Sequence, residues 1–367
     1  MASTYMCGTQ LKKKEVDMTK TRIFQVNQLQ QDFLVGGVFN NKLIGSWDLN
    51  PTNKDWSRPS WMEIKANSTP VSVTNMAPFT PNYWGDLSAR VLCQTFRDNA
   101  CGVSTYKAEG AAFPGAKAAL YKDITTNPKV ILCEDPIGPK STGYVAAGLI
   151  NEFGVYGSYM SPDPDNPRAL KTSRVHWDFD GKIISKNHDY VAITAAGPLN
   201  QSWVDANFTA PSGWIVAGFS PIKQFVLILL NKLNDDGTAN KDFNGFAILD
   251  PTGVAPDRFC LPTGPEWRKA RALSVSDDMR YCTFAYIGYN ATNLKWDEGA
   301  RAFDFETEQL YDLKVILGLD PWTAYKCVDA DFTETNGLVC TSLDVVKDSN
   351  GATVGMSRNL DLLTDWM

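Results

Sequence analysis

The chain has 367 residues, 44% of them hydrophobic and 21% charged, so it is long and apolar enough to bury a large core. The formal net charge of −6 argues against nucleic acid as the main partner, because phosphate binding needs clustered Lys and Arg. The longest apolar run, 225–230, is far short of the roughly 20 residues that span a bilayer, and residues 1–16 contain no apolar signal-peptide core. We therefore expect synthesis in the cytoplasm and no membrane span.

Short strands dominate the predicted secondary structure, because brief apolar runs bounded by Gly, Pro, Asn and Asp follow one another and helical periodicity is scarce. The clearest strand–turn–strand copies cover residues 214–228, 272–284 and 325–340. In the last two copies Ser, Asp or Asn supply the turn, as their backbone-bonding side chains favour. In chain order, the first strands of the repeated units are expected to begin near Phe24, Arg90, Tyr144, Trp214, Ala270 and Ala324.

An apolar residue followed by Asp and a turn recurs along the chain at intervals of roughly 55 to 75 residues, a spacing that suits a repeat of about four short strands. The strong examples are Trp47-Asp48, Trp177-Asp178, Leu249-Asp250 and Phe303-Asp304, and the weaker ones are Lys122-Asp123 and Leu360-Asp361. A tryptophan often precedes the first strand of a unit, and we expect these rings to pack between neighbouring units. They are Trp84, Trp214, Trp267 and Trp322.

Two of these segments resemble a known repeat superfamily. Phe219-Ser220-Pro221 and the residues from Ser274 to Asp278 are similar to the strand–turn–strand pattern of WD-repeat and TolB-type β-propellers. The resemblance covers about three units well and three loosely. It lacks the Gly-His and strict Trp-Asp pairing of WD40 blades. It therefore implies a fold superfamily and no particular activity, since propellers host many functions.

The sequence thus predicts an all-β fold, a single β-propeller of about six four-stranded blades. The last unit has no outer strand of its own, so we expect the N-terminal segment within Ser3–Val16 to supply it and close the ring, which removes an exposed sheet edge. The approximate blades are 20–80, 81–138, 139–205, 206–263, 264–318 and 319–367 plus the strand from 3–16.

Cysteine and histidine usage argues against a metal site. None of the eight cysteines forms a C-x-x-C, and there are only two histidines, so zinc modules are not predicted and no cofactor is expected. Cys282, Cys327 and Cys340 lie in apolar runs and are expected to be buried thiols. Cys93 and Cys101 would flank a hairpin turn and are the pair to test for a disulfide.

The candidate binding residues fall in the loops of one predicted face, where long connections gather. His188 is the better of the two histidines for acid–base work, and His176 is expected to be structural. No residue is assigned as catalytic. Asn234-Asp235-Asp236-Gly237 has no Glu to complete a calcium loop, so a polar hairpin turn is expected there. The candidates are His188, Asp189, Trp203, Asp235, Asp236, Trp296 and Asp297.

Two functions remain open. The first is a non-catalytic structural or interaction module in a larger protein assembly, such as a phage tail or nozzle-type component of a virion. Its partners would be other proteins, and self-association into a homo-oligomer is compatible with it. The alternative is a propeller enzyme of hydrolase, lyase or cyclase type, acting on a small or sugar-like substrate at the loop-rich face. The scarcity of histidine and of catalytic motifs favours the first.

Overall fold

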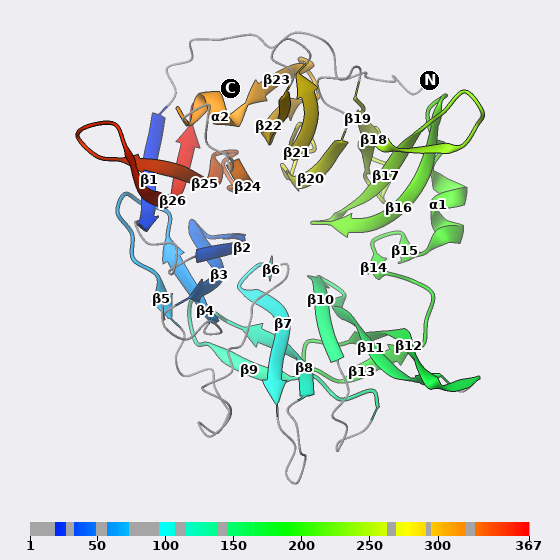
Figure 1. The fold of residues 1–367 in the computed structure, drawn as a ribbon. Coiled ribbons are helices and arrows are strands. Elements are labelled where there is room, and N and C mark those ends of the chain that lie inside the picture. Colours follow the sequence, from blue (N-terminus) through cyan, green and yellow to red (C-terminus); the bar gives the residue numbers. More distant parts are fainter. Residues whose placement is uncertain are drawn as a thin grey trace. The chain divides into compact units, whose positions relative to one another are not determined.

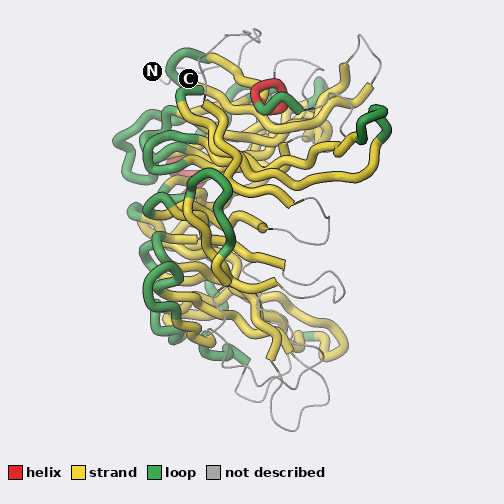
Figure 2. The backbone as a smooth tube through the Cα atoms, turned by 90° about the vertical axis from the view of Figure 1, so that its left-hand side faces the viewer, coloured by secondary structure: helices red, strands yellow, loops and turns green. Residues whose placement is uncertain are grey.

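A computed structural model describes residues 19–26, 33–48, 57–72, 95–106, 115–137, 145–163, 165–262, 269–290, 295–319 and 327–366. Strands dominate these residues, and the helices among them are α1 (Gln201–Asn207) and α2 (Leu313–Ile316) (Figure 2). The predicted all-β fold is confirmed. The chain separates into two compact units. The first unit comprises residues 1–29, 65–67 and 194–367, and the second comprises 30–64 and 68–193.

The second unit holds three four-stranded sheets, each built from strands consecutive in the chain (Figure 1). Neighbouring strands within each sheet are antiparallel, as hairpin connections require. The sheets are β2 (Phe33–Phe39), β3 (Lys42–Asp48), β4 (Ser57–Glu63) and β5 (Val71–Ser72); β6 (Thr95–Phe96), β7 (Asn99–Tyr106), β8 (Gly115–Lys122) and β9 (Lys129–Leu132); and β10 (Val145–Asn151), β11 (Gly154–Asp163), β12 (Asn166–Trp177) and β13 (Ile183–Lys186).

The first unit also contains three groups of four strands. Two of them are joined by one parallel pair, Asn244 with Lys269. A separate hairpin joins β14 (Ala192–Thr194) to β15 (Gly197–Leu199). The groups are β16 (Trp214–Ile222), β17 (Phe225–Leu233), β18 (Ala239–Leu249) and β19 (Arg258–Cys260); β20 (Lys269–Val275), β21 (Tyr281–Asn290), β22 (Lys295–Asp304) and β23 (Gln309–Asp312); and β24 (Cys327–Phe332), β25 (Leu338–Lys347), β26 (Thr353–Thr364) and β1 (Thr19–Val26).

Strand β1 completes a sheet that is otherwise built from the end of the chain. It pairs antiparallel with β26, and Thr19 lies opposite Thr364. The predicted start of the first inner strand near Phe24 is therefore wrong, because Phe24 lies in β1 and the next sheet begins at Phe33. The predicted closing segment Ser3–Val16 lies outside the described residues. A strand from the N-terminal region nevertheless pairs with the backbone edge of β26.

A one-residue bulge recurs in the first strand of five of the four-stranded groups. Each bulge inserts one residue that has no partner in the second strand, which bends the strand and increases its twist. Two of the five inserted residues are glycines, which adapt easily to an irregular backbone. The inserted residues are Gly36, Gly148, Ala217, Leu273 and Val328. The bulge therefore recurs at the same place in the first strand, although the inserted residue differs in type from one group to the next.

The recurring aspartates form the turns that their positions predict. The Asp178 carboxylate accepts hydrogen bonds from the backbone N–H of Asp180 and of Lys182, at 2.9 and 2.8 Å. Asp250 and Asp304 likewise accept from the N–H two residues onward, at 2.9 Å each. These side chains satisfy backbone donors where each third strand ends, so they fix the start of the turn to the fourth strand.

Apolar side chains from neighbouring sheets pack face to face within each unit. In the second unit, Val155, Val175 and Trp177 of the β10–β13 sheet share one buried cluster with Leu120 of β8. The Trp177 indole N–H donates to the Glu134 carbonyl oxygen at 2.8 Å. Alternate residues along β11 and β12 therefore face this core, and the residues between them face the other side of the sheet.

The predicted buried thiols are confirmed where the chain is described, and packing of the tryptophans between neighbouring units stays a prediction. Trp214 is half-buried against the cluster of the β16–β19 sheet, whereas Trp84, Trp267 and Trp322 lie outside the described residues. Cys282 is a buried free thiol and Cys340 is buried. Cys93 lies outside the described residues, and so does the side chain of Cys327.

Candidate functional site

The predicted site residues occupy separate elements. His188 and Asp189 follow β13 in the second unit, and Trp203, Asp235 and Asp236 belong to the first unit. Trp203 lies in α1 and packs against the apolar cluster of the β16–β19 sheet. Trp296 and Asp297 lie in β22, but their side chains are outside the described part of the chain.

The β17–β18 turn, with Asp235 and Asp236, is a polar hairpin turn, as the sequence predicts. Both aspartates are exposed. The Asp236 carboxylate accepts from the Thr238 hydroxyl at 2.6 Å and from its N–H at 2.9 Å. These hydrogen bonds lower the pKa of Asp236. Across the described residues, no three His, Cys, Asp or Glu side chains are grouped so that they could hold a metal ion.

A polar cluster occupies the face of the β10–β13 sheet opposite its core. Tyr156, His176 and Ser185 lie directly opposite one another on β11, β12 and β13. Tyr156 and His176 are buried, and their rings stack with centroids 4.3 Å apart. After β13 the chain brings two further rings to the cluster. They are His188 and Tyr190, which stack with ring centroids 3.6 Å apart. This sheet therefore gathers both histidines of the chain.

A chain of hydrogen bonds fixes the protonation of His176. The Phe153 carbonyl oxygen lies 2.9 Å from His176 Nε2 and can only accept, so Nε2 carries the proton. In the neutral ring Nδ1 is then an acceptor, and the Tyr190 hydroxyl, 3.3 Å away, donates to it. The Ser185 hydroxyl in turn donates to the Tyr190 oxygen through a short hydrogen bond. Ser185, Tyr190 and His176 thus form one directed relay.

His188 is held in the complementary tautomer. Its Nδ1 lies 3.0 Å from the Tyr190 carbonyl oxygen, so Nδ1 carries the proton and Nε2 is an acceptor. Nε2 is buried without a hydrogen-bond partner among the described residues. The neighbouring Asp189 is exposed, and its carbonyl oxygen accepts from the Arg174 guanidinium. The backbone of Asp189 is therefore tied to this cluster.

Burial determines the charge of the cluster. Loss of hydration lowers the pKa of His176 and of His188 below the ordinary value of 6.5, and it raises the pKa of Tyr156. Both imidazoles are therefore neutral at pH 7. A neutral imidazole that accepts from a tyrosine hydroxyl is a general-base arrangement, so the relay can polarise the Tyr190 oxygen. No pattern in the sequence points to Tyr190, because an irregular loop folds it onto the sheet.

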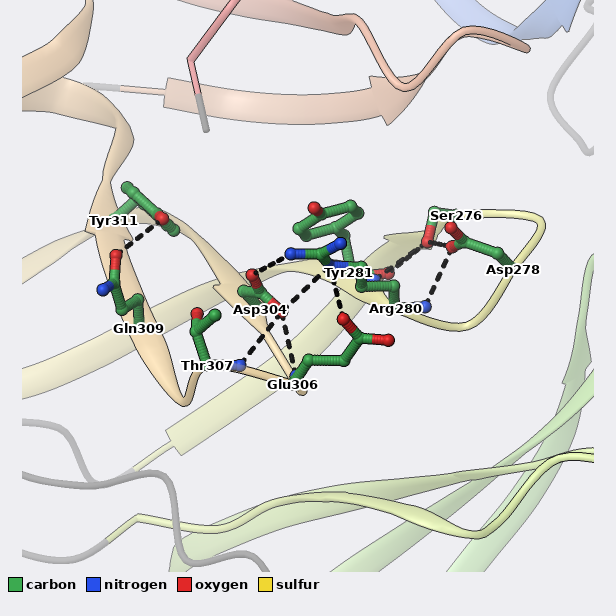
Figure 3. Close-up of polar contacts among 9 residues, drawn as sticks. All are labelled: Ser276, Asp278, Arg280, Tyr281, Asp304, Glu306, Thr307, Gln309 and Tyr311. Carbon is green, nitrogen blue, oxygen red and sulfur yellow. Dashed lines mark hydrogen bonds and ion pairs between the residues drawn. The ribbon is translucent and has the colours of Figure 1, made fainter. Parts of the chain in front are cut away.

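A second polar network joins the β20–β21 and β22–β23 turns in the first unit (Figure 3). Arg280 contacts the Asp304 carboxylate at 3.1 Å and the Glu306 carboxylate at 3.2 Å. Asp304 is only 2% exposed. Its burial opposes ionisation, but the hydrogen bonds from Arg280, Glu306 and Thr307 outweigh it and lower the pKa of Asp304. This network neutralises a buried carboxylate, and its geometry is that of a structural ion pair.

No family model and no curated protein matches the chain. Similar solved structures include a glycoside hydrolase, with 12% identity over 78% of this chain and 92% of that chain and a TM-score of 0.31. An endo-arabinase from Bacteroides thetaiotaomicron has 9% identity over 71% of this chain and 89% of that chain, with a TM-score of 0.25. A Bombyx mori GH32 beta-fructofuranosidase has 9% identity over 91% of this chain and 89% of that chain, with a TM-score of 0.29. At such scores these likenesses carry no argument about activity. In the described chain, no helix is both long and apolar enough to cross a membrane.

Proposed function

We propose that the chain is a six-bladed β-propeller, closed by β1, that serves as a non-catalytic interaction module in a larger protein assembly. Three four-stranded groups in each unit support the blade number, and the recurring bulge and aspartate turn support a common origin of the groups. One feature carries the interaction role, namely the outer parts of two long hairpins, here called ribbons, each of which exposes an aliphatic side chain.

The ribbon of the second unit is the outer part of the β11–β12 hairpin. Among the described residues, β10 pairs with β11 as far as Tyr159, and β13 pairs with β12 from Val175. The hairpin itself continues to Asp163. Between Val175 and the hairpin end, β12 pairs with no described strand other than β11, and an edge of this kind can accept a further strand. A partner that pairs with such an edge or covers its faces would stabilise the ribbon.

The first unit repeats this arrangement in the β25–β26 hairpin, whose end is the red loop in Figure 1. Among the described residues, β24 pairs with β25 as far as Ser342, and β1 pairs with β26 from Arg358. Each ribbon also exposes an aliphatic side chain, since Leu170 is 64% exposed and Val354 is 62% exposed. Their burial against a partner would release apolar surface from water.

The test compares Leu170→Asp and Val354→Asp with a matched control. Val254 is 87% exposed in the turn after β18, so Val254→Asp introduces the same charge away from both ribbons. Native mass spectrometry of the complex from the source should show loss of the partner for the ribbon variants and retention for Val254→Asp, all at unchanged thermal midpoint. A free monomer in the source, or ribbon variants that assemble normally, would contradict the proposal.

The relay around Tyr190 favours the enzyme as a second candidate. A hydroxyl polarised by His176 could take part in hydrolysis of a sugar-like substrate. The assay measures reducing-sugar release from sucrose and from arabinan, the substrate types that the glycoside hydrolase names suggest. Hydrolysis that Tyr190→Phe abolishes at unchanged thermal midpoint would replace the non-catalytic function.

A further inference from the structure

Three Asn-Gly pairs occur in the sequence, and the fold places them in different surroundings. They are Asn244-Gly245, Asn336-Gly337 and Asn350-Gly351. Asparagine is a thermolabile residue, because the backbone nitrogen that follows it can attack its side-chain carbonyl carbon. A following glycine favours this attack, since it has no Cβ to obstruct the nitrogen and adopts many backbone conformations. The local structure of each pair then decides whether the two atoms can meet.

The first pair is held inside a sheet. Asn244 lies in β18 opposite Asn231, and its side-chain oxygen accepts from the Ala270 N–H at 3.1 Å. Gly245 is buried, and a Cβ on it would lie only 2.5 Å from the Cys260 carbonyl oxygen. Neither the side chain nor the glycine can rotate without disrupting these contacts. The fold therefore protects Asn244.

The second pair lies in a turn whose backbone is tied down. The Asn336 N–H donates to the Thr333 carbonyl oxygen at 3.1 Å, and the Asn336 carbonyl oxygen accepts from the Trp366 indole N–H, also at 3.1 Å. Trp366 and Gly337 are both buried. A Cβ on Gly337 would lie 2.9 Å from the Thr333 hydroxyl oxygen. The backbone of this pair is thus fixed, and its glycine is removed from water.

The third pair occupies the tip of the β25–β26 ribbon, the red loop in Figure 1. Every residue from 347 to 354 is exposed, and the Asn350 side chain forms no hydrogen bond with another described residue. A Cβ on Gly351 would meet open space. The Gly351 N–H donates to the Asp348 carbonyl oxygen at 3.0 Å, but this bond lies in water. Such a tip opens locally at a low free-energy cost, so Asn350 and Gly351 can reach the reactive geometry.

We propose that Asn350 is a site of deamidation in the folded protein. The Gly351 backbone nitrogen loses its proton to hydroxide and attacks Cγ of Asn350. The new N–Cγ bond closes a succinimide ring, while the Cγ–Nδ2 bond breaks and Nδ2 leaves as ammonia. Water then opens the ring at either carbonyl and leaves an aspartyl or an isoaspartyl residue. Each product carries a carboxylate in place of the neutral amide, and water is the only co-reactant consumed.

The modification changes both the charge and the backbone of the ribbon tip. The Asp348 N–H donates to the Ala352 carbonyl oxygen at 2.9 Å and closes the turn around Asn350. An isoaspartyl residue inserts a methylene into the backbone of this turn, and either product adds a negative charge to the ribbon that exposes Val354. An ageing protein would thus lose affinity for its partner. This consequence rests on the proposed function, whereas the modification itself does not.

Peptide mapping of the whole folded chain measures the three sites in one sample. Trypsin cleaves after Lys and Arg, so the pairs fall in separate peptides, each with a single Asn, namely 242–258, 327–347 and 348–358. After incubation at mildly alkaline pH, mass spectrometry gives the fraction of each peptide in which an acid has replaced the amide. Peptide 348–358 should deamidate about tenfold faster or more than the others, which react only after local unfolding. Equal rates, or an unmodified Asn350, would overturn the proposal.

Two controls separate the fold from the Asn-Gly motif. In urea at a concentration that unfolds the chain, the three peptides should deamidate at similar rates; a preference for Asn350 that persists there would remove the structural basis of the proposal. Asn350→Gln, whose longer side chain closes the ring poorly, should leave 348–358 unmodified, and the matched variant Asn336→Gln should leave its rate unchanged. The rate at Asn350 should also rise with hydroxide concentration, and a rate independent of pH would contradict the succinimide route. These readouts hold even if the partner proves absent.

Discussion

One ion pair links β1 to β26, and the effect of its removal on the free energy of unfolding can be estimated. The Arg22 guanidinium contacts the Asp361 carboxylate at 2.6 Å and the Asn359 side-chain oxygen at 2.8 Å. The Asp361 side chain is 1% exposed and that of Arg22 is 32% exposed. Arg22→Gln would leave a buried carboxylate without its counter-charge, which costs about 3 to 5 kcal/mol at a fully buried pair. Because water can reach the Arg22 side, we expect about 2 kcal/mol.

That loss converts to a measurable shift of the thermal midpoint. At about 2.1 cal/mol/K per residue, a chain of 367 residues that unfolds as one unit has an unfolding entropy near 0.8 kcal/mol/K, so 2 kcal/mol lowers the midpoint by about 3 °C. Differential scanning calorimetry of Arg22→Gln, Asp361→Asn and the double variant gives the coupling energy. Asp242→Asn is the control, because the Lys269–Asp242 pair is exposed on both sides. An unchanged midpoint for Arg22→Gln would refute the reasoning.

Three further results are expected. Deleting residues 1–26 removes β1 and should lower the thermal midpoint sharply, whereas deleting residues 1–18 keeps β1 and should lower it less. Equal thermal midpoints for the two deletions would contradict the role of β1. Burial lowers the pKa of both histidines, so they stay neutral in the folded state while the unfolded chain gains protons. The free energy of unfolding should therefore fall as the pH drops below 6.5. Nuclear magnetic resonance should show both imidazoles titrating below that value. Gly154→Ala should cost at least about 3 kcal/mol by urea titration, because φ is 136° and the new Cβ would lie 2.3 Å from the Trp177 carbonyl oxygen; Gly148→Ala, with open space around it, should change little.

Local chemistry explains which parts of the fold the sequence predicts. Asp178, Asp250 and Asp304 each bond a backbone N–H two residues away, so the turn requires nothing distant and is visible in the sequence. The strand starts at Trp214 and near Ala270 follow from the same local patterns of apolar runs and turn residues. The Asn234–Gly237 hairpin turn is also local, and it is correctly predicted.

The errors arise where distant segments meet. Phe24 has the apolar pattern of any strand, and nothing near it in sequence indicates that its partner is Leu360. The bulges have no common residue type, since Leu273 and Gly148 occupy the same role. In the candidate site, His176 and Ser185 share a face because β12 and β13 pair, but Tyr190 reaches them through an irregular loop. Local periodicity cannot predict such a path.

The antiparallel pairing of β1 and β26 determines how the chain responds to force. Thr19 lies opposite Thr364, so the strands leave the same end of the sheet toward the two chain ends. A pull applied at both termini therefore acts across the ladder, and its hydrogen bonds are loaded one after another. The sheet would unzip at low force instead of shearing as a block.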